Sequence, residues 1–165
     1  MANPSYRSAE RADAMAISAL AKDALLPETL PGWTSEAVSG LLAKASPEAM
    51  IEHIGRAAFA HVSVDERRVV GFILCTSWRF LNLLVVEPSL QRQGIGSHLV
   101  KLLLRQLADA APDLSVVEVN ATRYSPPFYR RLGFYPLSEF IEFDGCKFAR
   151  LGYWRKNPLL STSEC

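Results

Sequence analysis

The sequence predicts a single-domain protein of the α/β (α+β) class, in which helices flank a central sheet of about seven strands. The chain has 165 residues, 49% of them hydrophobic, which suits one domain with a sizeable core. Apolar residues recur at helical spacing in the first third and after residue 94, and alternate as in strands elsewhere. Because no linker, repeat or low-complexity tract divides the chain, we expect one domain over residues 1–156 and a loose tail at 157–165.

Composition excludes several classes of function. The net charge is +1 and the 18 basic residues are spread along the chain, so we expect no nucleic-acid partner. The three cysteines are widely spaced and odd in number, which argues against a disulfide framework and favours a reducing cytoplasm. The first residues lack a basic-then-apolar signal pattern, and no apolar run approaches membrane-spanning length. We therefore expect a soluble cytoplasmic protein without a membrane partner.

Metal binding is also not expected. The three histidines, His53, His61 and His98, have no partner at metal-ligand spacing, and no Cys-x-x-Cys pair is present. We assign no metal.

The first third of the chain is predicted to be mostly helical after a short opening strand at residues 5–7. Ala, Leu, Ile and Met recur at helical spacing over residues 9–24, and Pro27 and Pro31 end that helix. Thr34 and Pro47 are each typical of a helix start, which predicts two more helices, the second reaching about residue 56.

Strands follow from residue 57, where the apolar period changes to two. Two strands separated by a polar break form a predicted hairpin over residues 59–64 and 69–75. The next segment, residues 80–86 (FLNLLVV), is almost continuously apolar and ends at Pro88. This predicts a strand covered on both faces, in the centre of the sheet.

The second half alternates helices and strands. Gly94 opens a helix to about residue 110, in which polar residues recur every four positions on a solvated face. A buried strand is predicted at 116–121, and Ser125 begins a short helix that Gly133 ends. The pair Asp144-Gly145 predicts a final hairpin between strands at 137–143 and 146–151.

The turn over residues 91–96 carries the first functional signal. A strand, a tight turn and a helix start bring unpaired backbone N–H groups together at the positive end of the helix dipole, where an anion can bind. Glycines at positions 94 and 96 remove side chains that would block this approach. Alone, the pattern Gln-x-x-Gly-x-Gly is weak, since a turn that only packs a helix on a strand has the same appearance. It matches neither the phosphate loop of nucleotide hydrolases nor the dinucleotide fingerprint.

Two flanking segments give the turn its context. Residues 84–88 (LVVEP) precede it, and residues 128–134 (FYRRLGF) match the pattern Phe-Tyr-x-x-x-Gly-Phe. Together these segments resemble the GNAT family, the GCN5-related N-acetyltransferases. The resemblance covers the order of elements along the whole chain and is most specific over residues 84–134. It implies a mixed, mostly antiparallel sheet and acetyl-CoA as donor.

The resemblance also implies roles for particular residues. The turn and Ser97 would bind the pyrophosphate, the strand at 84–86 would pair with the pantetheine arm, and Asn120 and Ser125 would lie on its other side. Tyr129 would stand beside the sulfur as general acid. The implied cofactor-binding residues are Leu84, Val85, Val86, Gln91, Arg92, Gln93, Gly94, Ile95, Gly96, Ser97, Asn120, Ser125 and Tyr129. At reference pKa values, proton transfer from tyrosine to a thiolate is uphill by only about 2 kcal/mol.

The general base is less well marked. Many family members place a carboxylate in the strand before the phosphate turn, whereas this strand has none before Glu87. Asn82 interrupts the apolar run and could hold a water molecule, although it cannot act as a base itself. Glu87 is a candidate that could equally be a solvated carboxylate, and proton loss through water is the remaining route.

The expected function is transfer of an acetyl group to a primary amine of a small molecule or peptide. The alternative is a module that binds an acyl-CoA without turnover. By resemblance, the amine should lie between the helices of residues 28–50 and the last hairpin, where five residues could shape its pocket: Trp33, Trp78, Phe80, Glu139 and Glu142. The sequence leaves the acceptor, the acyl chain and the oligomeric state open, and a homodimer is compatible with it.

Overall fold

The computed structural model describes residues 3–25 and 30–155. Its helices are α1 (Ala14–Ala24), α2 (Ser35–Lys44), α3 (Pro47–Arg56), α4 (Ile95–Ala110) and α5 (Pro126–Arg131). Its strands are β1 (Ser5–Ser8), β2 (Phe59–Asp65), β3 (Arg68–Cys75), β4 (Phe80–Leu81), β5 (Leu83–Val86), β6 (Val116–Ala121), β7 (Tyr135–Phe143) and β8 (Cys146–Trp154). The predicted helix stop at Pro27 and the tail at 157–165 lie outside the described residues.

Local signals determine where the helices begin. The Thr34 hydroxyl accepts a hydrogen bond from the Ala37 N–H (3.2 Å), and the Ser46 hydroxyl accepts one from the Ala49 N–H (3.2 Å). Each bond satisfies an N–H that has no acceptor within the helix. Pro47 occupies the first position of α3, where its missing N–H costs nothing. The helix starts predicted at these residues are confirmed.

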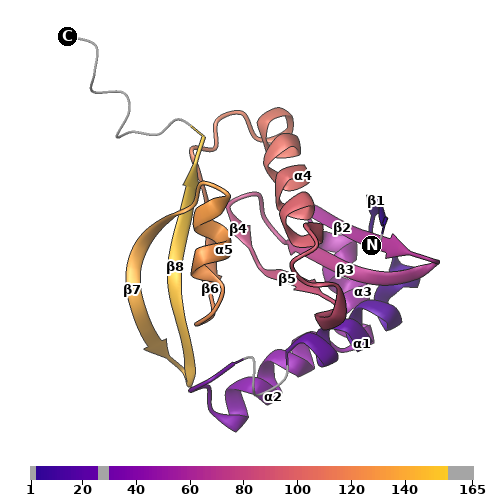
Figure 1. Ribbon diagram of the computed structural model, residues 1–165, viewed down its shortest axis with the longest axis horizontal. Coiled ribbons are helices and arrows are strands. Elements are labelled where there is room, and N and C mark those ends of the chain that lie inside the picture. The colour runs from indigo at the N-terminus through magenta and orange to yellow at the C-terminus, as the bar shows by residue number, and fades with distance from the viewer. Residues whose placement is uncertain (1–2, 26–29, 156–165) are drawn as a thin grey trace.

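The strands form two four-stranded sheets, in the orders β1-β2-β3-β5 and β4-β6-β8-β7. All neighbouring strands are antiparallel except β4 and β6, which run parallel. The predicted class, a mixed and mostly antiparallel sheet flanked by helices, is confirmed. Figure 1 shows the two sheets spreading apart from the point where β4 meets β5.

The main difference from the sequence prediction lies in the segment 80–86, which is two strands rather than one. The N–H of Glu118 donates to the Arg79 carbonyl (2.8 Å), and β4 pairs with β6. Asn82, the residue between the strands, donates its N–H to the Leu74 carbonyl (2.9 Å), and β5 pairs with β3. The segment is central in the molecule, as predicted, but each of its strands is the edge of a different sheet. We call this branching point the fork.

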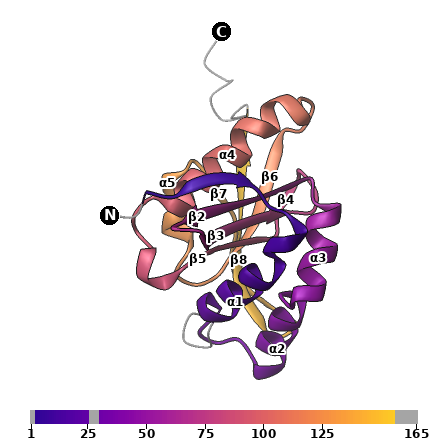
Figure 2. The same ribbon diagram turned by 90° about the vertical axis from the view of Figure 1, so that its right-hand side faces the viewer.

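Helices cover both faces of the first sheet. Helices α1 and α3 lie on one face and α4 lies on the other, as Figure 2 shows. The buried cluster on the α1 face includes Ile17, Leu20, Met50, Phe72 and Val85. The cluster on the α4 face includes Phe59, Ile73, Leu99, Leu103 and Tyr129 and continues into the second sheet through Val119 and Leu151. A single apolar cluster therefore joins the two sheets behind the fork.

One buried titratable group makes the stability of this core dependent on pH. His61, on β2, is only 9% exposed, and its ring stacks on Phe59 with the centroids 4.3 Å apart. Its Nδ1 atom has no hydrogen-bond partner within the described residues. Burial lowers the pKa of His61 below its ordinary value of 6.5. The folded chain therefore keeps His61 neutral at a pH where the unfolded chain binds a proton.

We predict that replacing His61 by glutamine flattens the acid limb of the stability curve. For the native chain, the free energy of unfolding should fall as the pH drops below about 6.5, because only the unfolded state gains the proton, by at most about 1.4 kcal/mol per pH unit. Urea titrations of both proteins between roughly pH 7.5 and roughly pH 5 measure how the free energy of unfolding changes with pH. This is the range in which the unfolded chain takes up the proton and the folded chain does not. Phe59→Leu is the control, since it removes the stacked ring but not the titrating group. An unchanged slope in His61→Gln would refute the assignment.

Candidate functional site

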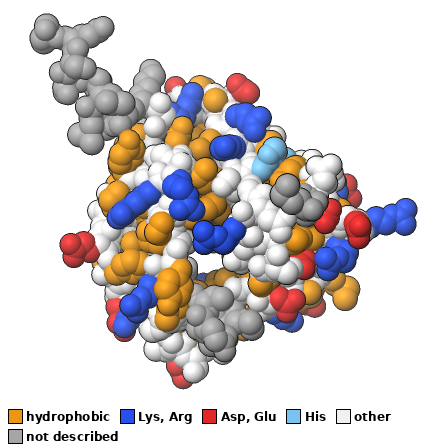
Figure 3. Space-filling model, in the orientation of Figure 1, with side chains coloured by type: hydrophobic (Ala, Val, Ile, Leu, Met, Phe, Trp, Pro, Cys, Tyr) orange, Lys and Arg blue, Asp and Glu red, His pale blue; other side chains and the backbone are white. Residues whose placement is uncertain are grey.

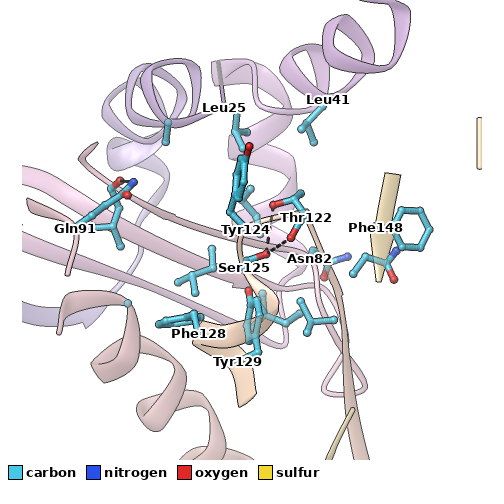
Figure 4. A pocket seen from close by; sticks show the side chains of 18 of the residues that line it. Leu25, Leu41, Asn82, Gln91, Thr122, Tyr124, Ser125, Phe128, Tyr129 and Phe148 are labelled. Carbon is cyan, nitrogen blue, oxygen red and sulfur yellow. Dashed lines mark hydrogen bonds between the residues drawn. The ribbon is translucent and has the colours of Figure 1, made fainter. Parts of the chain in front are cut away.

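A cavity of about 1350 Å³ opens at the fork. Five parts of the chain line it: α2 with the end of α1, the two strands of the fork, residues 90–97, the segment from β6 to α5, and the hairpin of β7 and β8. In Figure 4, Leu25 and Leu41 bound the helical side, Gln91 and Phe148 lie at opposite sides, and Tyr129 lies between them. Figure 3 shows Lys and Arg side chains among hydrophobic ones across this side of the molecule. We call this space the fork cavity.

One wall of the fork cavity is the free edge of β5. The N–H of Glu87 donates to the Val70 carbonyl (2.9 Å), so the residue after β5 still faces β3. Backbone groups alternate along a strand, so Val85 faces β3, whereas Leu84 and Val86 direct theirs to the opposite edge. No strand of the described chain pairs with that edge. Leu84 and Val86 both line the cavity and Val85 does not, so backbone groups that pair with no strand lie along the cavity wall.

A second wall is the amino end of α4. The first helical hydrogen bond runs from the His98 N–H to the Gly94 carbonyl (2.9 Å). The N–H groups of Ile95, Gly96 and Ser97 therefore have no acceptor within the helix, and all three residues line the cavity. Together with the positive end of the helix dipole, they form a site suited to an anion such as a phosphate.

The turn that leads into α4 has an unusual backbone. Arg92 (φ 63°) and Gly94 (φ 89°) both lie in the left-handed region, which costs a residue with a side chain roughly 1 kcal/mol or more. The Gln91 side-chain amide donates to the Val86 carbonyl (3.2 Å) and ties the turn to the end of β5. Backbone strain of this kind is typical of ligand-binding turns. Gln93 belongs to the turn but does not line the cavity.

The glycines of the turn are not required by packing. A Cβ atom added to Gly94 would meet no atom within 4 Å, and one added to Gly96 would lie 3.4 Å from the Phe128 ring and 3.6 Å from Val86, in ordinary contact. Only the positive φ of Gly94 demands glycine within the protein itself. The open space beside Gly94 fits a group that approaches the helix start from the cavity.

Tyr129 lies on α5, held by the residues that follow it. Gly133 adopts a left-handed conformation (φ 91°) that ends the helix and turns the chain back. The Phe134 N–H then donates to the Tyr129 carbonyl (3.1 Å), and the two rings pack edge to face with centroids 5.3 Å apart. This geometry explains the spacing Phe-Tyr-x-x-x-Gly-Phe, since the glycine lets the second phenylalanine pack against the tyrosine.

The Tyr129 hydroxyl points into the fork cavity (Figure 4). The residue is 6% exposed, and no group within the described residues hydrogen-bonds to the hydroxyl. Burial, with a smaller contribution from the charge of the nearby Cys75 thiolate, raises the pKa of Tyr129 above its ordinary value of 10. Tyr129 is therefore protonated at any working pH and can act as a proton donor.

Cys75 shows what the same surroundings do to a thiol. It belongs to the same buried cluster as Tyr129, and burial raises the pKa of its thiol to about 12. A thiol leaving group that reached the Tyr129 hydroxyl would be desolvated in a similar way. Its thiolate would be more basic than in water, which favours accepting a proton from tyrosine.

Three more residues predicted from the sequence line the cavity: one is exposed, and the side chains of the other two are held by hydrogen bonds. Asn120 is exposed on β6 and lines the cavity. The Ser125 hydroxyl is bonded within its own turn, donating to the Thr122 carbonyl (2.9 Å). Asn82 lines the cavity at the fork, and its side-chain oxygen accepts from the Thr76 N–H (2.7 Å), which orients the side-chain amide.

Glu87 is placed differently from what a general base requires. It does not line the fork cavity, and its side chain is only 25% exposed. One carboxylate oxygen accepts from the Ser89 hydroxyl (2.8 Å), and the other lies 3.4 Å from an Arg68 nitrogen. Because β5 ends before it, Glu87 faces the first sheet and its arginine rather than the fork. We therefore do not retain Glu87 as a candidate base.

The predicted acceptor region is partly corrected. Trp33 and Phe80 line the fork cavity, opposite residues of the last hairpin. Trp78 instead packs against Phe59 (centroids 6.1 Å apart). Glu139 lines a separate hollow beside α5, and Glu142 pairs with Lys147 (3.3 Å). None of these three side chains lines the fork cavity.

Sequence reasoning missed Tyr124 and Phe148. Tyr124 is 68% exposed and its ring lies across the cavity toward Leu25. Phe148, on β8, forms the opposite side (Figure 4). Tyr124 could have been predicted from the sequence, because it is an aromatic residue in the loop between Asn120 and Ser125, two residues implied to bind the cofactor. Phe148 had none, because only the strand pairing turns it toward the fork.

The part of the chain that the structure describes contains neither a metal-binding cluster nor a membrane-spanning helix. Residues 3–25 and 30–155 hold no group of three or more His, Cys, Asp or Glu side chains that could bind a metal ion. No described helix is long and apolar enough to cross a membrane.

Comparisons with known proteins agree with this geometry. Residues 29–152 match the profile of a family described as the acetyltransferase (GNAT) domain. A solved GCN5-related N-acetyltransferase from Rhodopseudomonas palustris is similar with a TM-score of 0.76 at 17% identity, covering 93% of this chain and 97% of that one. The PaiA N-acetyltransferase of Thermoplasma acidophilum, solved in complex with coenzyme A, has a TM-score of 0.73 at 17% identity over 92% and 99% of the two chains.

A third solved structure, the ribosomal-protein-S18-alanine N-acetyltransferase from Escherichia coli, has a TM-score of 0.66 at 16% identity over 92% of this chain and 94% of that one. At these identities the structures show a shared fold. No match was found among curated protein sequences.

We predict that replacing Gly133 by alanine destabilises the protein, because the left-handed φ strains a side chain and the new Cβ would lie 3.3 Å from Tyr153. The free energy of unfolding should fall by about 1 kcal/mol or more in urea titrations. Gly40→Ala is the matched control. Gly40 lies within α2 with no atom within 4 Å of the added carbon, so alanine there should stabilise by up to about 1 kcal/mol. Equal effects at both glycines would contradict the role given to the turn.

Proposed function

Because this chain belongs to the acetyltransferase (GNAT) family, we propose that it is an N-acetyltransferase that moves an acetyl group from acetyl-CoA to a primary amine. The observation that carries the proposal is the meeting of three features in one cavity. These are the free edge of β5, the unpaired N–H groups at the start of α4 and the hydroxyl of Tyr129. The first two suit a long ligand with an amide-bearing arm and a pyrophosphate, and the third supplies a proton.

The chain's own groups would bind the donor along its length. The N–H groups of Ile95, Gly96 and Ser97 would receive the pyrophosphate, with Arg92 in the preceding turn as a nearby cation. The outward N–H and carbonyl of Leu84 and the outward N–H of Val86 would pair with the pantetheine amides as a further strand would, while the Val86 carbonyl keeps its bond to Gln91. This arrangement points the thioester toward the fork and Tyr129.

The proposed reaction is direct attack by the amine nitrogen on the thioester carbonyl carbon. The new C–N bond forms as the C–S bond breaks, and the carbonyl oxygen, negatively charged in between, is stabilised by an outward N–H of β5. Tyr129 gives its proton to the leaving sulfur and regains one, through water, from the nitrogen that has become an amide. The buried surroundings that raise the pKa of Tyr129 would also raise that of the leaving thiol, as they do for Cys75, so burial does not by itself oppose this transfer.

The ammonium form of the acceptor must first lose a proton. Glu87 does not reach the cavity, and Asn82 has no basic group. We propose that water held at the fork between Asn82 and Asn120, which both line the cavity, carries this proton to solvent. The acceptor would enter past Trp33 and Phe80, where Glu36 and Asp144 supply negative charge that favours an amine.

The second candidate is a module that binds acyl-CoA without turnover. The observation that favours it is Asn82, an amide at the fork where a carboxylate would remove the proton of the amine. Thiol release separates the two candidates, since a binding module should release no coenzyme A with any amine.

We predict that Tyr129→Phe lowers kcat by about a hundredfold and leaves acetyl-CoA affinity within a fewfold. Phenylalanine keeps the ring contacts with Phe128 and Phe134, so the fold should persist. Thiol release against a panel of primary amines measures kcat, and calorimetry measures the affinity. In the native enzyme, the raised pKa of Tyr129 should keep kcat from falling on the alkaline side up to about pH 10. Binding without release for every amine, with no effect of Tyr129→Phe, would sink the enzyme proposal.

We predict opposite effects of Ser97→Asp on stability and on donor binding. A carboxylate in the first turn of α4 favours the helix dipole, so the melting temperature should stay or rise. The same charge should repel the pyrophosphate and raise the Kd for coenzyme A at least about tenfold. Ser97→Asn is the neutral control of the same shape and should stay within about threefold of the native Kd. Equal affinity of all three proteins would place the pyrophosphate elsewhere.

A further inference from the structure

An ion pair between Glu118 and Arg150 lies on the second sheet, beside residues that line the fork cavity, although neither member of the pair lines it. Glu118 is the parallel neighbour of Phe80 across β4 and β6, and Arg150 is the antiparallel neighbour of Asn120 across β8 and β6. Paired residues of adjacent strands project to the same face, as do residues two apart on one strand. The side chains of one face are therefore Phe80, Glu118, Asn120, Phe148 and Arg150, which we call the acceptor face.

Three members of the acceptor face, Phe80, Asn120 and Phe148, line the fork cavity. The ion pair therefore lies next to the place where the thioester would stand. Helix α5 packs on β8, where Ala149 and Leu151 are buried in the opposite face of the strand. The acceptor face is left to the cavity and solvent.

The ion pair itself is loosely made. Arg150 Nε lies 3.7 Å from Glu118 Oε2, beyond hydrogen-bond distance, and the two side chains are 47% and 24% exposed. Within the described residues, neither the two Nη groups of Arg150 nor the second carboxylate oxygen of Glu118 has a hydrogen-bond partner. A partly exposed pair of this kind stabilises a fold by at most about 1 kcal/mol. Its unused donors and acceptor are available to a ligand with both charges.

We infer that the amine acceptor is an α-amino acid with an apolar side chain, held by Arg150 and Glu118. The inference rests on the proposed function and adds the class of acceptor. The two Nη groups bind the acceptor carboxylate in a bidentate manner, and the free oxygen of Glu118 binds its ammonium. The rings of Phe80 and Phe148 receive the side chain. Carboxylate and ammonium on one carbon match the short spacing between the two protein groups.

Kinetics on matched substrates test this selectivity. We expect the native enzyme to acetylate L-phenylalanine and L-leucine with a kcat/KM at least about tenfold above that for phenethylamine and isopentylamine, which lack only the carboxylate. Arg150→Met should raise KM for the amino acids by about thirtyfold or more and leave the amines within about threefold. Arg150→Lys keeps the charge but not the planar guanidinium group. Its KM for the amino acids should lie between that of the native enzyme and that of Arg150→Met. Glu118→Gln should raise KM for both substrate types.

The matched control is another ion pair of the same kind. Arg56 and Glu52 form a pair of 2.7 Å on the surface of α3, a helix that contributes no residue to the lining of the fork cavity. Arg56→Met should leave every kinetic constant unchanged. Equal kcat/KM for amino acids and amines, together with no effect of Arg150→Met, would overturn the inference and leave the proposed acetyl transfer standing.

A binding experiment decides the inference without turnover. L-phenylalanine, phenethylamine and 3-phenylpropionate are titrated calorimetrically into the protein saturated with coenzyme A. We expect binding of L-phenylalanine that Arg150→Met weakens at least about tenfold, and weaker binding of both analogues. Such binding without thiol release would support the acceptor class and refute catalysis. Equal binding of all three ligands, or no binding of any, would overturn the inference.

Discussion

The site depends on one change of hydrogen-bond partner. Within four residues the backbone passes from the second sheet, where Phe80 and Leu81 pair with β6, to the first, where Leu83 begins to pair with β3. A strand in the interior of one continuous sheet has both edges paired. Here the change leaves one edge of β5 unpaired along a cavity of about 1350 Å³. The free backbone groups that we propose to hold the donor exist because the sheets separate at this point.

The apolar cluster behind the fork sets the chemistry of the cavity. It joins the α4 face of the first sheet to the second sheet, and it contains both Cys75 and Tyr129. Its low polarity keeps the Tyr129 hydroxyl protonated and would make a leaving thiolate more basic, as the pKa of about 12 for Cys75 indicates. The same packing that stabilises the two sheets therefore prepares a proton donor and a proton acceptor for each other.

Charge differs between the two ends of the cavity. The start of α4 and Arg92 suit an anionic donor. At the other end, α2 and the hairpin contribute Glu36 and Asp144 together with Lys44, so both signs of charge are present there. The fork strands carry no carboxylate, which is why we propose that water removes the proton. In the same proposal, Glu118 would act on the position of the acceptor rather than on its proton, since it stands beside Arg150 on the acceptor face.

The sequence by itself determined the features that depend on neighbouring residues. Helix starts at Thr34 and Pro47, the left-handed turn at Gly133 and the glycine turn at Gly94 follow from capping, backbone conformation and local spacing. Tertiary structure alone decided that segment 80–86 divides at Asn82, that Glu87 turns to Arg68, and that Glu118 meets Arg150. These outcomes depend on which strands pair and in which register. Strand pairing brings together residues that are far apart in the chain, and no local sequence pattern encodes those contacts.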